Sequence, residues 1–325
     1  MFNMIKVNTS DYFRRVDFVF DKQVTSPSIS FKMEIIKKQD RKVKSMKTAI
    51  VTDSTAYIPK ELREELNIHM IPLSVVFGEE SYREEVDITA EAFYDELKAR
   101  KDLPTTSQPP IGEFVELFEK LGQENDAIIS IHLSSGISGT YQGAITAGDM
   151  VEGVRVYAFD SEISCIVQGF YALEAAEMAN EGKPVEEIVA RLDEIKKSVR
   201  AYFMVDDLTN LQRGGRLSSA AAFVGSLLQV KPILCFEDKV IVPFEKIRTR
   251  KKALNRVFEL FDEDASKGVP MRAALIHGNI EVEAKELKAE LEKKYPHVEF
   301  LLSYFGPVIG THLGEGAIGL GWYMK

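Results

Sequence analysis

Apolar and polar residues follow two different patterns along the chain, and the change falls near residue 200. Up to that point, short apolar runs are separated by segments whose apolar residues recur at helical spacing. Strands are predicted at 48–51, 70–77, 127–133 and 154–159. Helices are predicted at 59–66, 90–99, 111–121, 139–150, 165–179 and 185–199. This order favours a mainly parallel sheet that is covered by helices on both faces.

After about residue 200 the predicted strands outnumber the helices. Strands are predicted at 201–205, 233–236, 240–247, 272–277, 298–303 and 317–322, and helices at 218–230, 250–261 and 282–294. Glu237, Asp238 and Lys239 form a predicted turn between two of the strands, which indicates a hairpin and antiparallel pairing. We therefore expect a second domain of the α+β class.

On this pattern the 325 residues divide into three parts. Residues 1–45 show no steady period, and we expect a poorly ordered extension there. Residues 46–200 and 201–325 are the two predicted domains. The net charge is −9, but residues 1–45 hold 10 Lys or Arg and 5 Asp or Glu, so the remainder carries −14. A body this acidic argues against nucleic acid or an anionic membrane surface as the main partner.

The two cysteines and the longest uncharged run bear on the compartment. Cys165 and Cys235 lie among apolar neighbours, which favours buried thiols in a reducing cytoplasm. The uncharged run 127–148 spans 22 residues, enough to be considered as a membrane span. Because 12 of these residues are Ser, Gly, Thr, Gln or His, we expect a soluble, cytoplasmic protein without an integral membrane segment.

Four polar segments, rich in glycine or hydroxyl groups, stand at predicted strand ends. They cover residues 52–54, 105–109, 134–142 and 306–316. In an open α/β sheet, ligands bind beyond the carboxyl ends of the strands. In the segment SSGISGTYQ at 134–142, Ser138 is the predicted N-cap of a helix whose first N–H groups favour an anion. A capped helix without a ligand is the alternative.

Signatures of catalysis and of metal binding are weak. The segment at 134–142 lacks the lysine of a Walker loop, and no GxGxxG follows the first strand, so a nucleotide site has little support. Ser138 lies in Gly-Ile-Ser-Gly-Thr, where Thr140 replaces the second glycine of a nucleophile elbow. His132, His277 and His312 are candidate bases, but one sequence does not place them beside Ser138. Without HExxH, paired-cysteine or EF-hand motifs, we expect no metal and no cofactor.

A histidine and two arginines mark further candidate regions. His312 lies in a glycine-rich loop near the end of the chain and can donate a hydrogen bond from either ring nitrogen. Arg213 and Arg216 flank two glycines, and such a pair suits carboxylate or phosphate recognition. A structural histidine and solvated arginines are the alternatives. The apolar segment 217–230 that follows is either core or the lining of a ligand channel.

Together these segments resemble the DegV family of bacterial fatty-acid-binding proteins, which includes the FakB-type subunits of fatty acid kinase. The matching motifs run in order from residue 46 to residue 323: VTDST, an IPL strand, TSQP, SSGISGTYQ, Asp160-Ser161, RGGR, KPIL and GPVIGTHLGEGA. Each motif alone is weak, whereas their order over nearly 280 residues is specific. Residues 1–45 have no counterpart.

The resemblance implies an α/β fold with the ligand between two domains, an N-terminal Rossmann-like parallel-sheet domain and a C-terminal α+β domain with a largely antiparallel sheet. A long-chain fatty acid would lie in a buried tunnel there, with its carboxylate hydrogen-bonded by Thr106 and Ser138 and with His312 nearby. Further residues are implied at the head group or facing the kinase: Ser107, Gly139, Arg213, Arg216 and Arg248.

The resemblance also implies that the chain is not an enzyme. A separate ATP-binding subunit of the fatty acid kinase would phosphorylate the bound carboxylate to an acyl phosphate, so that this chain presents the substrate. A stand-alone phosphotransferase or hydrolase acting on a small anionic substrate is the main alternative, and a regulatory module that senses acyl lipids is a third. One departure from the family pattern is Glu315, which replaces the proline of a Gly-Pro-Gly and brings a negative charge close to the expected carboxylate site.

Overall fold

The computed structural model describes residues 47–100, 102–217 and 231–325, which belong to one compact unit. The extension expected at 1–45 and the helix or channel lining expected at 218–230 lie outside the described residues. The division into two domains near residue 200 stays a prediction, because the described residues are grouped as one unit.

The elements follow largely the predicted order. The first part holds β1 (Thr48–Asp53), η3 (Ser54–Ala56), α2 (Lys60–Glu65), β2 (Ile68–Ile71), β3 (Ser74–Phe77), β4 (Glu80–Arg83), α3 (Ala90–Ala99), β5 (Thr105–Ser107), α4 (Ile111–Gly122), β6 (Ala127–His132), α5 (Thr140–Gly148), β7 (Arg155–Asp160), α6 (Cys165–Asn180) and α7 (Val185–Ser198). The second part holds β8 (Arg200–Met204), α8 (Thr209–Arg213), β9 (Lys231–Glu237), β10 (Val240–Ile247), α10 (Arg250–Ala265), β11 (Met271–His277), α11 (Glu281–Lys294), β12 (Val298–Tyr304), α12 (Pro307–Leu313) and β13 (Ile318–Met324).

Two large sheets confirm the predicted fold class. The first has four strands in the order β2-β1-β6-β7, all parallel. The second has six strands in the order β10-β9-β8-β13-β11-β12 and is antiparallel except for the β11–β12 pair. The protein is thus α/β, with an N-terminal parallel sheet and a C-terminal, largely antiparallel sheet.

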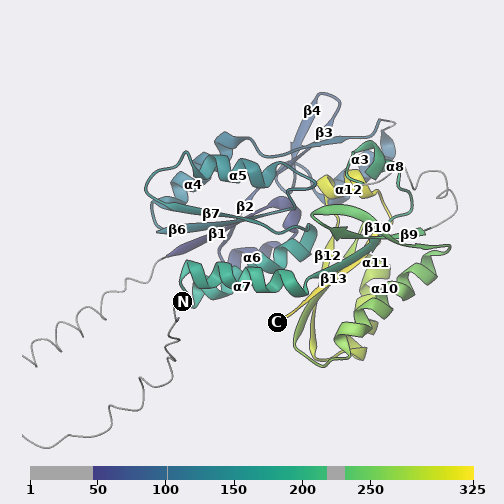
Figure 1. Cartoon of the computed structure of the whole chain (residues 1–325). Coiled ribbons are helices and arrows are strands. Elements are labelled where there is room, and N and C mark those ends of the chain that lie inside the picture. Colours follow the sequence, from purple (N-terminus) through teal and green to yellow (C-terminus); the bar gives the residue numbers. More distant parts are fainter. Residues whose placement is uncertain (1–46, 101, 218–230) are drawn as a thin grey trace, which may run out of the picture. The chain divides into compact units, whose positions relative to one another are not determined.

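Helices α6 and α7 lie between these two sheets (Figure 1). Helix α6 packs on the four-stranded sheet opposite α4 and α5 and also packs on α7, while α6 contacts β11 and α7 contacts β13. Helices α10 and α11 cover the other face of the six-stranded sheet. The α6 sequence CIVQGFYALEAA is apolar on nearly all sides, as expected for a helix buried between layers. One apolar core therefore runs from Ile50 of the first sheet to Ile276 of the second.

The strand predicted at 70–77 is wrong, because it is two strands in different sheets. β2 pairs with β1, whereas β3 joins β4 and β5 in a small antiparallel sheet. Pro72 lies between β2 and β3 and has no N–H for a strand ladder. The glycine-rich loop predicted around His312 is also wrong, since residues Pro307–Leu313 form α12, with Pro307 in its first turn.

Candidate functional site

Thr106 and His312 meet although 206 residues separate them. Thr106 lies on β5, where it pairs with Val75 of β3, and His312 lies on α12, which packs against both strands. The distance between Thr106 Oγ1 and His312 Nε2 is 3.0 Å. Both side chains are half-buried, so they stand at the edge of the protein interior. The structure thus brings together two of the predicted site residues.

The His312 ring is neutral at neutral pH. Burial lowers its pKa to about 4, and the nearby Arg216 guanidinium acts in the same direction. The ring Nδ1 is buried and has no hydrogen-bond partner among the described residues. Gly214 packs directly against this nitrogen, because a Cβ at that position would lie 2.3 Å from it. The first glycine of RGGR is therefore required by the close approach of His312.

Ser138 and His312 line the same polar cavity of about 270 Å³. Its lining residues are Leu73, Thr106, Ser107, Gln108, Leu133, Ile137, Ser138, Gly139, Arg216, Val308, Ile309 and His312. Ser138 Oγ is 2.8 Å from Thr140 Oγ1 and also accepts a hydrogen bond from the Thr140 N–H. The prediction that Ser138 is the N-cap is wrong by one residue, since α5 begins at Thr140 with Gly139 in that position.

Gln108 is a lining residue that our sequence reasoning missed. Its side chain packs over Gly139, where an added Cβ would lie 2.1 Å from Oε1 of Gln108. Its position one residue after Ser107 in the TSQP segment was the available signal. Gln108 therefore lines the polar cavity where β5 meets the start of α5.

The three arginines separate into different surroundings. Arg216 donates a hydrogen bond from Nε to the Ile137 carbonyl oxygen, at 3.2 Å, and lines the polar cavity. Arg213 is exposed and lines an adjoining cavity of about 310 Å³, which Thr106, Arg216 and His312 also border. Arg248 is exposed between β10 and α10, outside the residues that line these cavities. The structure therefore groups Arg213 and Arg216, but not Arg248, with the other candidates.

A narrow apolar cavity continues inward from the polar one. Its apolar lining includes Ile163, Val167, Phe203, Phe236, Ile241, Ile276, Phe305, Leu313 and Leu320. Ile137, Ile309, Arg216 and His312 line both cavities, so polar and apolar surfaces meet at these four side chains. The room in the apolar cavity is only about 40 Å³.

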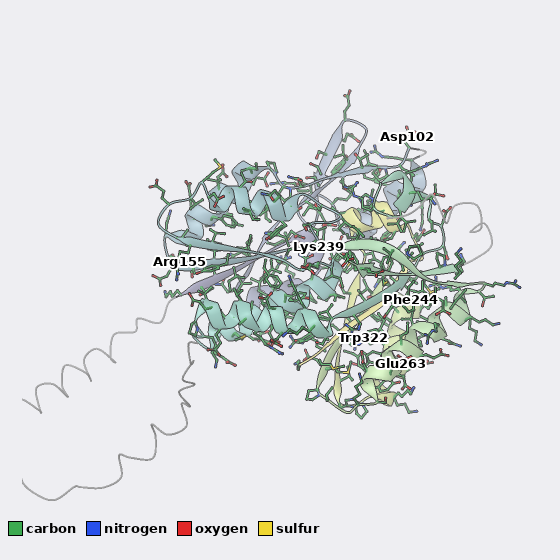
Figure 2. All side chains as sticks on the ribbon, in the orientation of Figure 1. Asp102, Arg155, Lys239, Phe244, Glu263 and Trp322 are labelled. Carbon is green, nitrogen blue, oxygen red and sulfur yellow. The ribbon has the colours of Figure 1, made fainter. Side chains whose placement is uncertain are left out.

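The β9–β10 hairpin closes against the loop that carries Ser138. Lys239, labelled in Figure 2, stands at the tip of this hairpin. Its ammonium group lies 3.0 Å from Asp160 Oδ2, and its carbonyl oxygen accepts a hydrogen bond from Ser134 Oγ at 2.6 Å. A Cβ at Gly136 would lie 2.3 Å from the same carbonyl oxygen. The glycine in SSGIS therefore lets the hairpin approach the loop.

His132 belongs to a separate, fully buried cluster. Its Nε2 lies 2.7 Å from Ser130 Oγ and its Nδ1 lies 3.0 Å from Asp53 Oδ2, an arrangement similar to a Ser-His-Asp triad. The side chains of His132 and Asp53 are 0% exposed, and neither lines a cavity described above. Neither His132 nor His277 lines the cavity that holds Ser138. The described geometry thus gives Ser138 no support as a nucleophile activated by either histidine.

Glu315 does not line the polar cavity. Its carboxylate lies 2.8 Å from Lys98 Nζ and accepts a hydrogen bond from Asn279 Nδ2 at 2.7 Å. The expected negative charge is therefore paired with Lys98 of α3, outside the polar cavity.

Three further expectations concern thiols, metals and membranes. Cys165 is buried as predicted, whereas Cys235 is half-buried. Within the part of the chain that the structure describes, no group of three or more His, Cys, Asp or Glu side chains could hold a metal ion. Among those same residues, every helix is too short or too polar to span a membrane.

The fold and the cavities define a two-sheet α/β protein in which a hydroxyl- and histidine-lined cavity adjoins an apolar one. The chain belongs to the DegV family, since the family model described as "Uncharacterised protein, DegV family" matches residues 47–325.

Individual relatives match nearly the same part of the chain as the family model. Protein DegV of Bacillus subtilis (strain 168) is 66% identical over 281 residues, which are 86% of this chain and 100% of that protein. The crystal structure of DegV from Bacillus subtilis, described as a fatty acid binding protein, matches with a TM-score of 0.83 at 66% identity and covers 86% of this chain and 100% of that one. A fatty-acid-binding DegV family protein from Thermus thermophilus matches with a TM-score of 0.81 at 31% identity, with coverage of 86% and 100%.

Proposed function

We propose that this protein binds a long-chain fatty acid, with the carboxylate in the polar cavity and the acyl chain in the apolar cavity. The observation that carries the proposal is the shared wall of the two cavities at Ile137, Ile309, Arg216 and His312. An amphipathic ligand with a charged head and an apolar tail fits such a junction. The fatty-acid-binding relatives from Bacillus subtilis and Thermus thermophilus support the same ligand class.

Thr106, Ser138 and His312 are the proposed carboxylate-binding residues. When the neutral His312 ring carries its proton on Nε2, it donates to Thr106 Oγ1, and the Thr106 proton is then free for a ligand oxygen. Ser138 supplies a second hydroxyl in the same cavity, and Arg216 supplies a positive charge. Hydrogen bonds of this kind to a charged acceptor are worth about 1.5–3 kcal/mol each.

The acyl chain supplies affinity through burial, at about 0.8 kcal/mol for each methylene group. The apolar cavity has about 40 Å³ of room, against about 270 Å³ in the polar cavity. A long chain therefore enters only when lining side chains such as Phe203 and Phe236 move apart. The measured affinity is the burial gain less the free energy of this rearrangement.

We further propose that the bound carboxylate is presented to the ATP-binding subunit of a fatty acid kinase, which converts it to an acyl phosphate. The support is geometric, because Thr106, Arg216 and His312 border both the polar cavity and the adjoining cavity beside the exposed Arg213. A carboxylate bound at Thr106, Arg216 and His312 also faces the adjoining cavity, so a partner subunit can approach it from there. The alternative, a stand-alone phosphotransferase or hydrolase, requires turnover by this chain alone.

Fatty-acid binding is tested by titrating the purified full chain with saturated and unsaturated C14–C18 fatty acids. We expect Thr106→Ala and Ser138→Ala each to weaken binding by about 1–3 kcal/mol, because each removes a donor to the carboxylate. Ser130→Ala is the matched control, since it removes a hydroxyl that also bonds to a histidine but lies outside the cavity. Absence of binding to every fatty acid, or equal affinity of all three variants and the wild type, would contradict the site.

The kinase step is tested by trapping acyl phosphate with hydroxylamine in mixtures of chain, palmitate, ATP and a purified ATP-binding kinase subunit. We expect product only when all four are present. Arg213→Ala should lower the rate about tenfold without changing palmitate affinity, as for a lost charge pair at an interface. Lys183→Ala, which removes an exposed lysine paired with Glu187, is the control. Product formed without the kinase subunit would favour the stand-alone alternative.

A further inference from the structure

Glu84 is a fully buried carboxylate immediately after β4. Its Oε2 accepts a hydrogen bond from Ser54 Oγ at 2.6 Å. Its Oε1 accepts from Tyr57 OH and from the Val308 N–H, both at 2.8 Å. No Lys, Arg or His side chain in the described ranges forms an ion pair with Glu84, so these three donors are its stabilising partners.

The direction of the two hydroxyl hydrogen bonds is fixed by backbone amides. Ser54 Oγ accepts from the Leu73 N–H at 3.0 Å, and Tyr57 OH accepts from the Ile309 N–H at 3.2 Å. Each hydroxyl oxygen therefore has an amide donor, and its own proton points to Glu84. The network is complete when the Glu84 carboxylate is ionised and accepts from all three donors.

This network holds the start of the helix that carries His312. Val308 and Ile309 follow Pro307 at the beginning of α12, and helix N–H groups at that place have no partner within the helix. Glu84 accepts one of the two amides directly and the other through Tyr57. His312 lies in the last turn of the same short helix.

The surrounding packing makes the position of α12 well defined. A Cβ at Gly306 would lie 2.4 Å from Cε1 of Tyr57 and 3.0 Å from Oε1 of Glu84. Tyr94 OH donates to the Phe305 carbonyl oxygen at 2.8 Å, and a Cβ at Gly310 would lie 2.8 Å from the same hydroxyl. Because this packing is close, we expect a change in the hydrogen bonds of Glu84 to move the backbone of α12 and not only nearby side chains.

We propose that Glu84 is a positioning residue that places α12, and with it His312, by accepting these three hydrogen bonds in its ionised form. This inference rests on the proposed function for its ligand readout, since His312 contacts ligand only if the fatty acid binds as described above. Leu73, Val308 and Ile309 also line the polar cavity, so the network reaches two of its walls.

The network can change its protonation near neutral pH. Burial raises the pKa of Glu84 to about 7, although the three donors act against this and Glu85 adds to it. A proton on Oε2 would meet the proton of Ser54, whose oxygen already accepts from Leu73. Ser54 would then lose its acceptor, and the contacts to α12 would weaken. The positioned state is therefore favoured above about pH 7.

The tyrosines near the network and Cys165 do not change protonation in this range. Burial raises the pKa of the neighbouring tyrosines and of the cysteine, so these groups remain protonated at neutral pH. Glu85 is paired with Arg63 at 2.7 Å. The facing groups are Tyr57, Tyr94, Tyr304, Cys165, Glu85 and Arg63.

The ligand experiment measures palmitate affinity of the full chain from pH 6 to pH 8.5. We expect wild-type affinity to rise with pH, and Glu84→Gln to bind about fivefold or more weakly at pH 8.5 with no pH dependence. Glu85→Gln is the matched control, because it makes the same charge change one residue away, at a carboxylate paired with Arg63 and Tyr304; it should keep the pH dependence, with a midpoint at lower pH because Glu85 raises the pKa of Glu84. A pH profile of Glu84→Gln equal to that of the wild type would overturn the proposal.

A second experiment needs no ligand and follows the His312 imidazole by NMR. Because the pKa of His312 is about 4, its ring does not titrate above pH 6, and a change in its signals reports movement of α12. We expect these signals to shift with a midpoint near pH 7 in the wild type and to stay constant in Glu84→Gln. Constant signals in the wild type would overturn the proposal even if palmitate binds.

The two experiments separate the two hypotheses. A wild-type chain that binds no fatty acid but shows the His312 shift would contradict the proposed function and support the role of Glu84. If Glu84→Gln does not fold, Tyr57→Phe replaces it, because that change removes the acceptor of the Ile309 N–H and one donor to Glu84 but leaves the Ser54 and Val308 donors in place. We expect Tyr57→Phe to displace the His312 signals above pH 8, and unchanged signals would count against the proposal.

Discussion

His132 and His312 each place a ring Nε2 beside a hydroxyl group, at 2.7 Å from Ser130 and 3.0 Å from Thr106. Their other ring nitrogens differ. Nδ1 of His132 bonds to Asp53, whereas Nδ1 of His312 is buried without a partner among the described residues. His132 is fully buried, while His312 lines the polar and apolar cavities. The pairing of a histidine with a hydroxyl group is therefore structural for His132 and Ser130. For His312 and Thr106 it is a candidate ligand contact.

The difference lies in what completes each hydrogen-bond network. Asp53 accepts from His132, Thr55, Gln168 and the Leu133 N–H, so the buried cluster satisfies its groups internally. It ties β1 and β6 to α6. The His312 network ends at a cavity, where a ligand can add the missing partner. A triad-like order of residue types is thus no evidence of catalysis unless a substrate can reach the hydroxyl group.

The largest effect is expected when the buried cluster is broken. Asp53→Ala removes the acceptor of the His132 ring and of the Leu133 N–H and one acceptor each of Thr55 and Gln168, and we expect it to lower the free energy of unfolding by about 3–5 kcal/mol. Urea unfolding followed by circular dichroism measures this. Asp95→Ala, at an exposed position of α3, is the control and should change stability by less than about 0.5 kcal/mol. If Asp53→Ala lowers the free energy of unfolding by less than about 1 kcal/mol, the His132 cluster is not the structural element that we infer, and the distinction from His312 fails.

Hydrophobic patterns predicted helices and strands correctly where the whole pattern lies within one element. The helix at Ala90–Ala99 and the strand at Val240–Ile247 match the predicted ranges. Thr89 caps that helix by accepting from the Ala92 N–H, and Asp238 and Lys239 have the positive φ values of a tight hairpin turn. The strand predicted at 70–77 failed because the apolar run continues across a proline at which the chain changes sheet.

The candidate site was predictable only as a set of segments. Motif order placed Thr106, Ser138 and His312 in the family pattern, but the pairing of His312 with Thr106 depends on a contact across 206 residues, and that of His132 with Asp53 on a contact across 79. Glu84 gave no local signal at all, because Val308, one of its partners, lies 224 residues away. A buried carboxylate held by hydroxyl and amide groups follows no sequence spacing and is visible only in the folded chain.

A smaller effect is expected from crowding the second histidine. Gly214→Ala adds a Cβ 2.3 Å from His312 Nδ1 and 2.9 Å from its Cε1, so the ring must shift and its contact with Thr106 is disturbed. We expect the free energy of unfolding to fall by up to about 3 kcal/mol, as for other overpacked sites, together with weaker palmitate binding. Differential scanning calorimetry and titration measure the two effects.

Removal of the clashing ring is the control for this change. Gly214→Ala combined with His312→Ala should recover most of the lost stability, because the added methyl group then has room, while palmitate affinity stays low. Gly112→Ala, at a glycine of α4 whose added Cβ meets nothing within 4 Å, should not lower stability and should leave binding unchanged. A double variant as unstable as Gly214→Ala would show that the crowding involves another group, such as the Asn210 carbonyl oxygen 3.1 Å away.

The smallest effect concerns the charge state of His312 in the ligand-free protein. Burial lowers its folded-state pKa to about 4, from an ordinary value of 6.5, so between these values the unfolded chain binds more protons than the folded one. The stability contributed by the neutral ring is present above pH 6.5 and is lost as the pH falls. We expect the wild type to lose about 1–2 kcal/mol relative to His312→Asn between pH 7 and pH 5, measured by urea unfolding at each pH. Glu84 is present in both proteins, so its own pH dependence cancels in the difference. If the difference in the free energy of unfolding between the wild type and His312→Asn stays constant with pH, then burial does not lower the pKa of His312. The contrast between the two histidines would then rest on hydrogen-bond geometry alone.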